Sequence, residues 1–450
     1  MVLMSSAQAA QAGRARRKAV PRAALGLWEG DFPGGDRDPL AIIDEQNETR
    51  LQELVPLRME RMAQSAFTFY RGTAAIMAAD LAKGQHSGIM VAACGDAHVS
   101  NFGFYASPQR TLLFDLNDFD EAAWAPWEWD LKRLTTSIIV AGQATHRDTA
   151  VILEAARNSI TSYLRATRSI AQIDPLARYY THFDPESAMG TLDKDSKKAV
   201  KRATKAAMRR TGERAAGKLT EIGHDGRSQF LENPPAIARA TSDTEEVVRQ
   251  GLERYIASAN VDVQMLLQQY EMVDVARRAV GVGSVGTRCL VSLMSDADSN
   301  HLVLQTKQAG RSVLEQYGGI EQPALVNERV SQQGQGARVV SLQRILQAYS
   351  DPFLGFFTND LGDFYVRQFH DMKGGIDTET LSDAAFLQYA RSCAIVLARA
   401  HCQSGRSAEI TAYAGKGPQI TAALLDWCFA YARTATADFV AFEKRLAQSR

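Results

Sequence analysis

The sequence has no net charge, because 51 Lys and Arg residues are balanced by 51 Asp and Glu residues over 450 positions. Neutrality with 45% hydrophobic residues argues against a nucleic-acid packaging protein, a disordered chain and a fibre. The sequence also lacks an apolar run near the ~18 residues that cross a bilayer, and its first residues lack the apolar segment of a secretory signal. We therefore expect a cytoplasmic protein with no membrane partner and no specific nucleic-acid partner.

Cysteines are few, and no two of them form a CxxC pair. Their odd number and scattered positions argue against a disulfide framework and against a zinc site, and favour buried thiols in a reducing compartment. The five cysteines are Cys94, Cys289, Cys393, Cys402 and Cys428. The sequence contains no internal repeat.

Basic residues gather in two segments. Residues 1–27 hold five basic residues and no acid, which predicts a flexible basic tail over residues 1–37. The segment Lys197–Lys218 holds nine basic residues and one acid, so it is either a solvated helix face or a site for an anionic partner. Four of its cations recur every four residues, on one side of a helix: Lys197, Lys201, Lys205 and Arg209. The rest of the chain is acidic.

Hydrophobic periodicity predicts an α+β protein with a mainly helical part and a mainly β part. Helical spacing covers Pro39–Leu81 and the helix-rich region that ends near residue 275, and it returns with an apolar stripe over Phe386–Ala400. Short strands are expected at Ile89–Cys94, Thr111–Leu116, Val275–Met294, His301–Thr306, Arg338–Leu342 and Phe364–Phe369.

Two polar clusters directly follow predicted strands. The first is Gly95–Asn101 and the second is Asp115–Glu121. Side chains at the ends of strands tend to form sites. One carboxylate could accept a proton, and a later one together with Asn101 could hold a divalent cation through oxygen ligands.

A glycine-rich segment lies between two predicted strands farther along the chain. It contains Gly281, Gly283, Ser284 and Gly286. In a dinucleotide-binding fold a helix follows the last glycine, whereas here a strand follows. The order of strand, glycine loop and strand instead matches the phosphate-covering flap of kinases. The next strand ends on Lys307, a cation placed to reach nucleotide phosphates.

The motif Gly95-Asp96-x-His98-x-x-Asn101, followed by a strand, by Asp118-Phe119 and then by Asp130-Leu131, resembles the catalytic segment of aminoglycoside and choline phosphotransferases of the protein-kinase-like superfamily. From about Asp38 to Arg406 the chain also resembles the bacterial family catalogued as domain of unknown function 2252. The segments that carry this second resemblance are Phe67–Gly72, Cys94–Gly103, Phe114–Leu134, Gly281–Arg288, Phe364–Gly374 and Ala398–Gly405.

The resemblance implies a role for each matching residue. Asp96 would be the catalytic base, with Asn101 and Asp118 as magnesium ligands. Asp115 and Asp120 compete with Asp118 for the metal role, and the spacing to Asp130-Leu131 favours Asp118. Asp130 would brace the catalytic loop as a structural acid, and His98 would brace it as well.

The resemblance also implies a nucleotide site. Lys307 would contact the α and β phosphates beneath the glycine flap, held by a nearby acid. We expect Glu315 to be that acid, with Glu328 at the spacing more usual of protein kinases. The strand that contains Arg367 resembles the strand and hinge where adenine docks.

The implied fold is a two-lobed protein-kinase-like α+β fold that is circularly permuted, because the glycine flap and Lys307 follow Asp96 instead of preceding it. Such a permutation is physically permissible, since chain termini commonly lie close together. The expected organisation is a tail (1–37), a helical catalytic lobe (38–270), a β-rich nucleotide-binding lobe (271–372) and C-terminal helices that complete the helical lobe (373–450).

The implied activity is ATP- and magnesium-dependent phosphoryl transfer to a hydroxyl of an unidentified small molecule or protein. Two alternatives remain open. The first is a non-catalytic kinase-like protein that binds nucleotide or regulates a partner. The second is a metallophosphoesterase that uses Asp96, His98 and Asp118, although that class needs a downstream Gly-Asn-His signature, which this sequence lacks.

Overall fold

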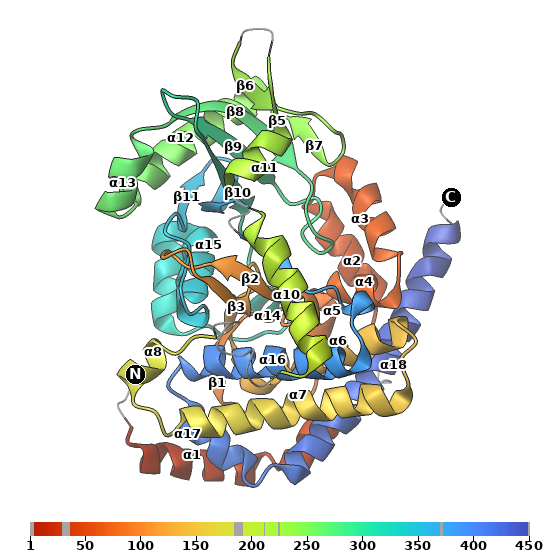
Figure 1. Ribbon diagram of the computed structural model, residues 1–450. Coiled ribbons are helices and arrows are strands. Elements are labelled where there is room, and N and C mark those ends of the chain that lie inside the picture. Colours follow the sequence, from red (N-terminus) through yellow and green to blue (C-terminus); the bar gives the residue numbers. More distant parts are fainter. Residues whose placement is uncertain are drawn as a thin grey trace.

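The computed structural model describes residues 4–28, 37–183, 192–210, 212–223, 226–369 and 372–448. The described residues form an α+β protein, with long helices in the lower half of Figure 1 and an antiparallel sheet in the upper half. None of the described helices combines the length and apolarity that a bilayer-spanning helix needs.

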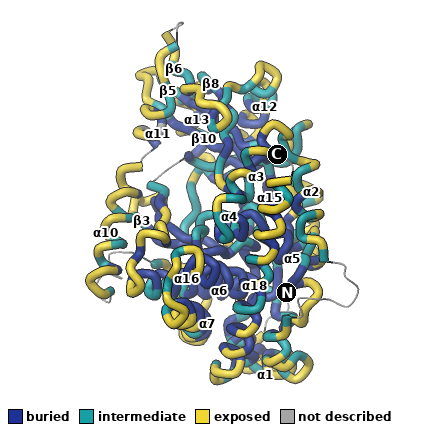
Figure 2. The backbone as a smooth tube through the Cα atoms, turned by 90° about the vertical axis from the view of Figure 1, so that its right-hand side faces the viewer, coloured by how far each residue is buried: buried dark blue, intermediate teal, exposed yellow. Residues whose placement is uncertain are grey.

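The core of the helical part is built from α6 (Trp127–Ala144), α7 (Thr149–Ile170), α16 (Asp383–Cys402) and α18 (Pro418–Gln448). Most residues of α6 and α16 are buried, which Figure 2 marks in dark blue, because these helices lie inside this part. The apolar stripe predicted over Phe386–Ala400 is confirmed in α16, because Phe386, Ala390 and Leu397 are buried against the other helices.

The residues expected to form a flexible basic tail instead contain the helix α1 (Ser6–Ala19), which lies along α17 (Ser407–Ala414). Alanine-rich sequence favours the helix, and a capping box between Ser5 and Gln8 begins it. Gly13 allows the close approach, because a Cβ at this position would lie 2.2 Å from the carbonyl oxygen of Glu409. The turn Arg22–Gly26 then packs on α18.

The helical pattern predicted from Pro39 to Leu81 is confirmed by successive short helices. These are α2 (Pro39–Glu48), α3 (Val55–Met62), α4 (Ala66–Arg71) and α5 (Ala74–Ala82). Two further helices are α8 (Pro175–Tyr179) and α10 (Lys194–Met208). In Figure 1, α10 lies across the front of the molecule, between the sheet and α16.

Short strands connect the two parts. β1 (Met90–Ala93) pairs with β4 (Ala123–Pro126), and β2 (Phe102–Ala106) lies between β3 (Leu112–Leu116) and β13 (Gly374–Gly375). The strands predicted before the two polar clusters therefore form. The first cluster follows the end of β1, and the second begins with the last two residues of β3.

The large sheet is antiparallel, in the order β11-β12-β10-β9-β8-β7. Its strands are β7 (Ile237–Arg239), β8 (Glu271–Arg278), β9 (Cys289–Ser295), β10 (His301–Gln308), β11 (Gly355–Asn359) and β12 (Gly362–Gln368). One face packs against α12 (Ser242–Ser258) and α13 (Val261–Leu267), and the other contacts α11 (Gly212–Leu219). A small hairpin of β5 (Thr220–Ile222) and β6 (Ser228–Phe230) extends from the same end. The sequence predicted that the β-rich part begins at residue 271. The sheet also includes β7, which lies before that boundary.

The strand predicted at Arg338–Leu342 is wrong. These residues belong to the helix α15 (Ala324–Leu346), which follows α14 (Val313–Gln316) and packs on β11 and β12. The local Val-Val pair favours a strand, but burial of Val339, Val340 and Leu346 against the helical core stabilises the helix. Gly334 interrupts α15 with a φ of 77°.

Candidate functional site

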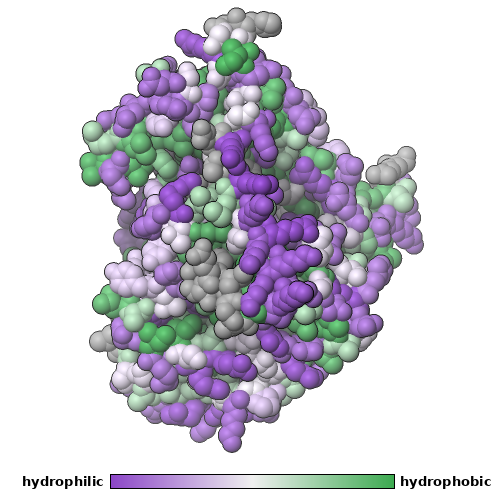
Figure 3. Space-filling view, in the orientation of Figure 1, coloured by the Kyte–Doolittle hydropathy of each residue, from purple (hydrophilic) through white to green (hydrophobic). Residues whose placement is uncertain are grey.

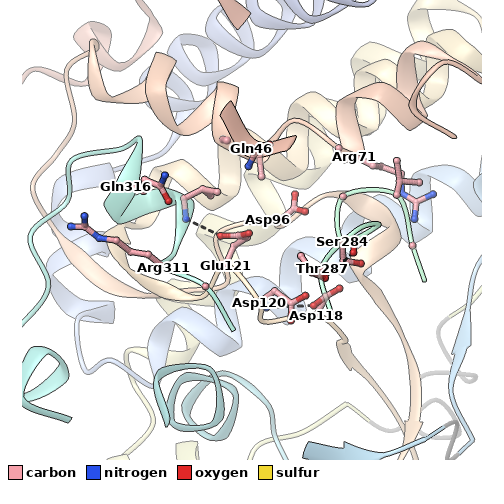
Figure 4. A pocket seen from close by; sticks show the side chains of 18 of the residues that line it. Gln46, Arg71, Asp96, Asp118, Asp120, Glu121, Ser284, Thr287, Arg311 and Gln316 are labelled. Atoms are coloured by element: carbon pink, nitrogen blue, oxygen red, sulfur yellow. Dashed lines mark hydrogen bonds between the residues drawn. The ribbon is translucent and has the colours of Figure 1, made fainter. Parts of the chain in front are cut away.

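A cavity of about 560 Å³ lies where the polar clusters after β1 and β3 meet the glycine loop between β8 and β9. Figure 4 shows Asp96, Asp118, Asp120, Ser284 and Thr287 around this one space. An adjoining cavity of about 330 Å³ reaches Lys307 and shares Asp118 and Ser284 with the first. The structure thus brings together the base, metal and nucleotide residues predicted from distant segments.

The loop after β1 is held by a buried carboxylate at the start of α6. Asp130 accepts hydrogen bonds from the backbone amides of Cys94 (2.7 Å) and Gly95 (3.1 Å) and from the ring of His401 (3.1 Å). Gly95 has a φ of 78°, and a Cβ there would lie 2.1 Å from the carbonyl oxygen of Glu121. Only glycine fits this turn, which aims the next residue into the cavity.

That next residue is Asp96. Its carboxylate accepts a hydrogen bond from the guanidinium of Arg133 at 2.8 Å, and the His98 ring lies 3.7 Å away. Burial raises the pKa of Asp96 to about 6, although the charge and hydrogen bond of Arg133 act in the opposite direction. Arg133 is fixed in turn, because it stacks on Tyr70 and donates to the Tyr70 carbonyl oxygen at 2.7 Å.

His98 and Asn101 complete the loop. The Asn101 side-chain amide donates to the Asp96 carbonyl oxygen at 2.7 Å, and the Asn101 backbone donates to the His98 carbonyl oxygen. His98 is buried, and burial lowers its pKa well below the ordinary value. Its Nδ1 has no hydrogen-bond partner among the described residues. Asn101 lines the cavity with Asp96, as a metal ligand beside the base would.

Lys307 and two aspartates form the charged centre of the site. The ammonium of Lys307 contacts the carboxylate of Asp120 and lies 3.8 Å from that of Asp118. Lys307 is almost fully buried, whereas the Asp118 side chain is 38% exposed and faces both cavities. Burial would lower the pKa of Lys307, but Asp118 and Asp120 raise it well above its ordinary value.

Asp118 is surrounded by cations. Burial would raise its pKa, but Lys307, Arg367 and Lys373 together hold that pKa well below the usual range. Arg367 donates a hydrogen bond to the side-chain oxygen of Gln305 at 2.9 Å, and its charge interacts with that of Asp118. Asp118 is therefore a carboxylate throughout the physiological pH range, as a metal ligand must be.

The acid that holds Lys307 is Asp120, and neither glutamate expected from the sequence does so. Glu315 forms an ion pair with Arg311, four residues earlier, and Glu328 is exposed on α15. Asp120 also accepts from the Tyr365 hydroxyl at 2.6 Å.

Arg338 anchors this aspartate loop to α15. Its guanidinium is buried and donates to the carbonyl oxygens of Asp120 (2.9 Å) and Gly310 (2.8 Å), and it also contacts that of Ala122. The helix that the sequence pattern missed therefore positions the charged centre.

Asp115, a competing candidate for the metal, lies elsewhere. It is buried, and it accepts hydrogen bonds from the backbone amides of Leu116 and Ala348, each at 2.8 Å. Burial raises its pKa. It joins β3 to the segment after α15 and does not line either of the two cavities.

The glycine loop closes over the cavity from the sheet side. Gly281 and Gly286 have φ values of 71° and 91°, which favour glycine. The carbonyl oxygen of Gly281 accepts from Arg61, and that of Gly286 accepts from the Leu51 amide at 2.8 Å. A Cβ at Gly283 would lie 3.4 Å from the Arg71 carbonyl oxygen, and the Ser284 hydroxyl donates to the Val280 carbonyl oxygen.

Several cations that line the two cavities were not identified from the sequence, among them Arg71 and Lys373. Arg71 lines both cavities, and burial lowers its pKa although Asp96 and Asp118 act in the opposite direction. Burial and the charge of Arg367 lower the pKa of Lys373 to about 7. The sequence offered one signal for each residue: Arg71 ends an aromatic cluster, and Lys373 follows a strand. Neither signal indicates which cavity the side chain enters.

The residues present fit a magnesium ion that is completed by a nucleotide. In the described part of the chain, no three His, Cys, Asp or Glu side chains form a ready-made metal site. Magnesium commonly takes one or two protein oxygen ligands, together with phosphates and waters. Asp118 and Asn101 offer such oxygens at one cavity.

Fold and site together define an α+β protein with a polar cleft between a helical part and an antiparallel sheet. Residues 50–445 match the family described as "Uncharacterized protein conserved in bacteria (DUF2252)", and the chain belongs to this family. No curated protein and no protein of known structure matches the chain.

Proposed function

We propose that the protein is an ATP- and magnesium-dependent phosphotransferase with a circularly permuted, two-lobed protein-kinase-like arrangement. The observation that carries the proposal is the meeting of Lys307 with Asp118, at 3.8 Å, in the cleft that also holds Asp96 and the glycine loop. A lysine on a strand, a metal-binding aspartate and a catalytic aspartate around two adjoining cavities match the parts that kinases use.

The permutation is supported by chain order. Lys307 and the glycine loop follow both aspartates in sequence, yet their strands bring them to two adjoining cavities that share Asp118. Contacts between elements decide the site, and their order along the chain does not.

In the proposed reaction, Asp96 orients the acceptor hydroxyl and takes its proton. Its pKa of about 6 suits a general base near neutral pH. Lys307, Arg71 and the amides of the glycine loop hold the phosphates of ATP. Asp118 and Asn101 would hold magnesium, which would supply positive charge to neutralise the charge on the phosphates. Arg133 keeps the Asp96 carboxylate in place.

The test is turnover of ATP by the purified protein with magnesium and a panel of hydroxyl-bearing metabolites, with autophosphorylation measured by intact mass. We expect Asp96→Asn to keep nucleotide affinity while turnover falls by about 10²- to 10⁴-fold. Asp118→Asn should lose magnesium-dependent nucleotide binding. The control is Glu328→Gln, an exposed acid outside the cleft, which should behave as wild type.

The outcomes separate the alternatives. Normal turnover by either cleft variant would contradict the assigned roles. Nucleotide binding without turnover on any acceptor would replace the proposal with a non-catalytic nucleotide-binding protein. Hydrolysis of phosphate esters without ATP, abolished by changes at Asp96, His98 and Asp118, would favour the metallophosphoesterase.

A further inference from the structure

A second charged pocket adjoins the cavity of about 330 Å³, with which it shares Phe369. It has a volume of about 220 Å³, and we call it the basic pocket. Its lining consists of Arg209, Arg210, Arg214, Lys218, Leu219, Arg278 and Phe369. Among the described residues that line it there is no carboxylate. The positive charges that line the pocket repel one another. A bound anion would relieve this repulsion, so the pocket attracts anions.

Arg278 forms the floor of the basic pocket. Its guanidinium stacks on the ring of Phe369, at 4.4 Å from the ring centre. Its Nη1 is buried and has no hydrogen-bond partner in the described part of the chain. Burial lowers the pKa of Arg278, which reflects the cost of holding this cation away from water. A buried donor without an acceptor is a position that a bound anion would satisfy.

The lining comes from both parts of the molecule. Arg209 and Arg210 follow α10, which packs on α16 and on the small sheet of β2 and β13. Arg214 and Lys218 belong to α11, which packs on β10 of the large sheet. Arg210 is also bound to the segment after β12, because its carbonyl oxygen accepts from the Met372 amide at 2.8 Å.

The pocket is one end of a longer basic surface. The exposed face of α10 continues away from it with Lys194, Lys198, Lys201, Arg202 and Lys205. Figure 3 shows strongly hydrophilic side chains gathered over this helix. The buried face of α10 holds small residues, among them Ser196 and Ala207, so the helix is fixed on the protein with its cations outward. This surface raises the local concentration of anions near the pocket.

We propose that the basic pocket binds a small anion with several negative charges, such as a polyphosphate or the phosphate tail of a metabolite, and that this ligand links the helical part to the sheet. Guanidinium groups bind phosphate oxygens bidentately, and the pocket holds more cations than one single charge would need even without Arg214, namely Arg209, Arg210, Lys218 and Arg278. The basic pocket shares only Phe369 with the lining of the two cleft cavities, and this proposal does not depend on the proposed phosphotransferase activity.

The test is isothermal titration calorimetry with inorganic tripolyphosphate as the probe, at low and at moderate ionic strength. We expect saturable binding to the wild-type chain that weakens as salt rises. The double variant Arg209→Gln with Lys218→Gln, both exposed, should bind at least about tenfold more weakly. Arg278→Gln should have a similar effect, through the pocket floor.

The matched control removes the same charge from the far end of α10. Lys194→Gln with Lys198→Gln should keep most of the affinity, and Lys307→Met should leave this site in place because it changes only the cleft. Equal affinity in the Arg209/Lys218 variant and in wild type would overturn the proposal, and so would loss of binding in Lys307→Met alone. Binding of a single-stranded oligonucleotide should also be measured for both double variants. If both weaken that binding equally, the basic surface binds nucleic acid, and the proposal of a small-anion pocket is overturned.

Discussion

Two aspartates near the cleft show how burial divides enclosed carboxylates from accessible ones. Asp130 is 1% exposed, and its hydrogen bonds are made within the protein. Asp118 is partly exposed and keeps a charge that three cations stabilise. A carboxylate that ends in a cavity beside unmatched positive charge is available to a ligand, whereas one enclosed by backbone amides is not.

The first prediction follows from this difference. Asp130→Ala should lower the free energy of unfolding by about 3 kcal/mol, because the amides of Cys94 and Gly95 would be left buried without an acceptor. Urea unfolding followed by tryptophan fluorescence measures the change. The control is Asp44→Ala, an exposed partner of Arg445, which should cost less than about 1 kcal/mol. Equal costs would show that Asp130 does not brace the loop.

Lys132 provides a prediction on pH. It is 3% exposed in α6, over the ring of Trp427, and burial lowers its pKa from about 10.5 to about 8, although Glu128 acts in the opposite direction. Below pH 8 the lysine is protonated in both states, so the cost of burying its charge is constant. Between about pH 8 and 10.5 only the unfolded state keeps the proton, so the stability of the folded state rises with pH through this range.

Lys132→Met should therefore be more stable than wild type by about 1–3 kcal/mol at pH 7, and this advantage should shrink as the pH rises from 8 to 10. Urea unfolding of both proteins at each pH measures the difference. The variant Lys416→Met, at an exposed position, corrects for loss of surface charge. An advantage that stays constant with pH would contradict the assignment.

At the residue scale, the sequence identified some of the polar residues that line the cleft and missed how they pair. Asp96 and Asp118 follow hydrophobic strands and Lys307 lies near the end of one, so their positions could be predicted from alternation and motif spacing. The partner of Lys307 could not, because Asp120 lies 187 positions away and the contact depends on where β10 crosses the aspartate loop. Arg71 was missed for the same reason.

At the element scale, tertiary contacts decide where local patterns are ambiguous. The α1 sequence is basic and rich in alanine, which suits either a solvated tail or a helix. Its burial against α17 depends on Gly13, whose missing side chain leaves room for the Glu409 carbonyl oxygen. For α15, burial against the sheet and the helical core outweighs the strand preference of two valines. Neither contact is visible in the sequence itself.

Gly13→Ala tests the packing of α1. Alanine favours a helix, but its Cβ would clash with the Glu409 carbonyl oxygen, so α1 should detach at a cost of about 2 kcal/mol. Trypsin cleavage after Arg14, Arg16 and Arg17 should then become about tenfold faster. Gln11→Ala, on the exposed side of α1, is the control and should leave the cleavage rate unchanged. Equal cleavage rates for wild type and Gly13→Ala would indicate that α1 is not held against α17.

At the scale of the whole molecule, the cleft exists because two parts of the fold meet there. The helical part supplies Asp96 from the loop after β1, and the sheet part supplies Lys307 and the glycine loop. The aspartate loop after β3 reaches across and is fixed by Arg338 of α15. Alternation and spacing predicted the α+β class and both groups of residues. The sheet boundary was placed too late, because β7 is a short edge strand whose membership is decided by pairing with β8.

The most direct test of the account is a crystal structure of the protein with a non-hydrolysable ATP analogue and magnesium. We predict that the phosphates of one nucleotide lie between Lys307 and Asp118, beneath residues 281–287. The metal should bind Asp118 and Asn101, and the terminal phosphate should face Asp96. A nucleotide bound elsewhere, or a cleft that stays without nucleotide at saturating concentration, would contradict it.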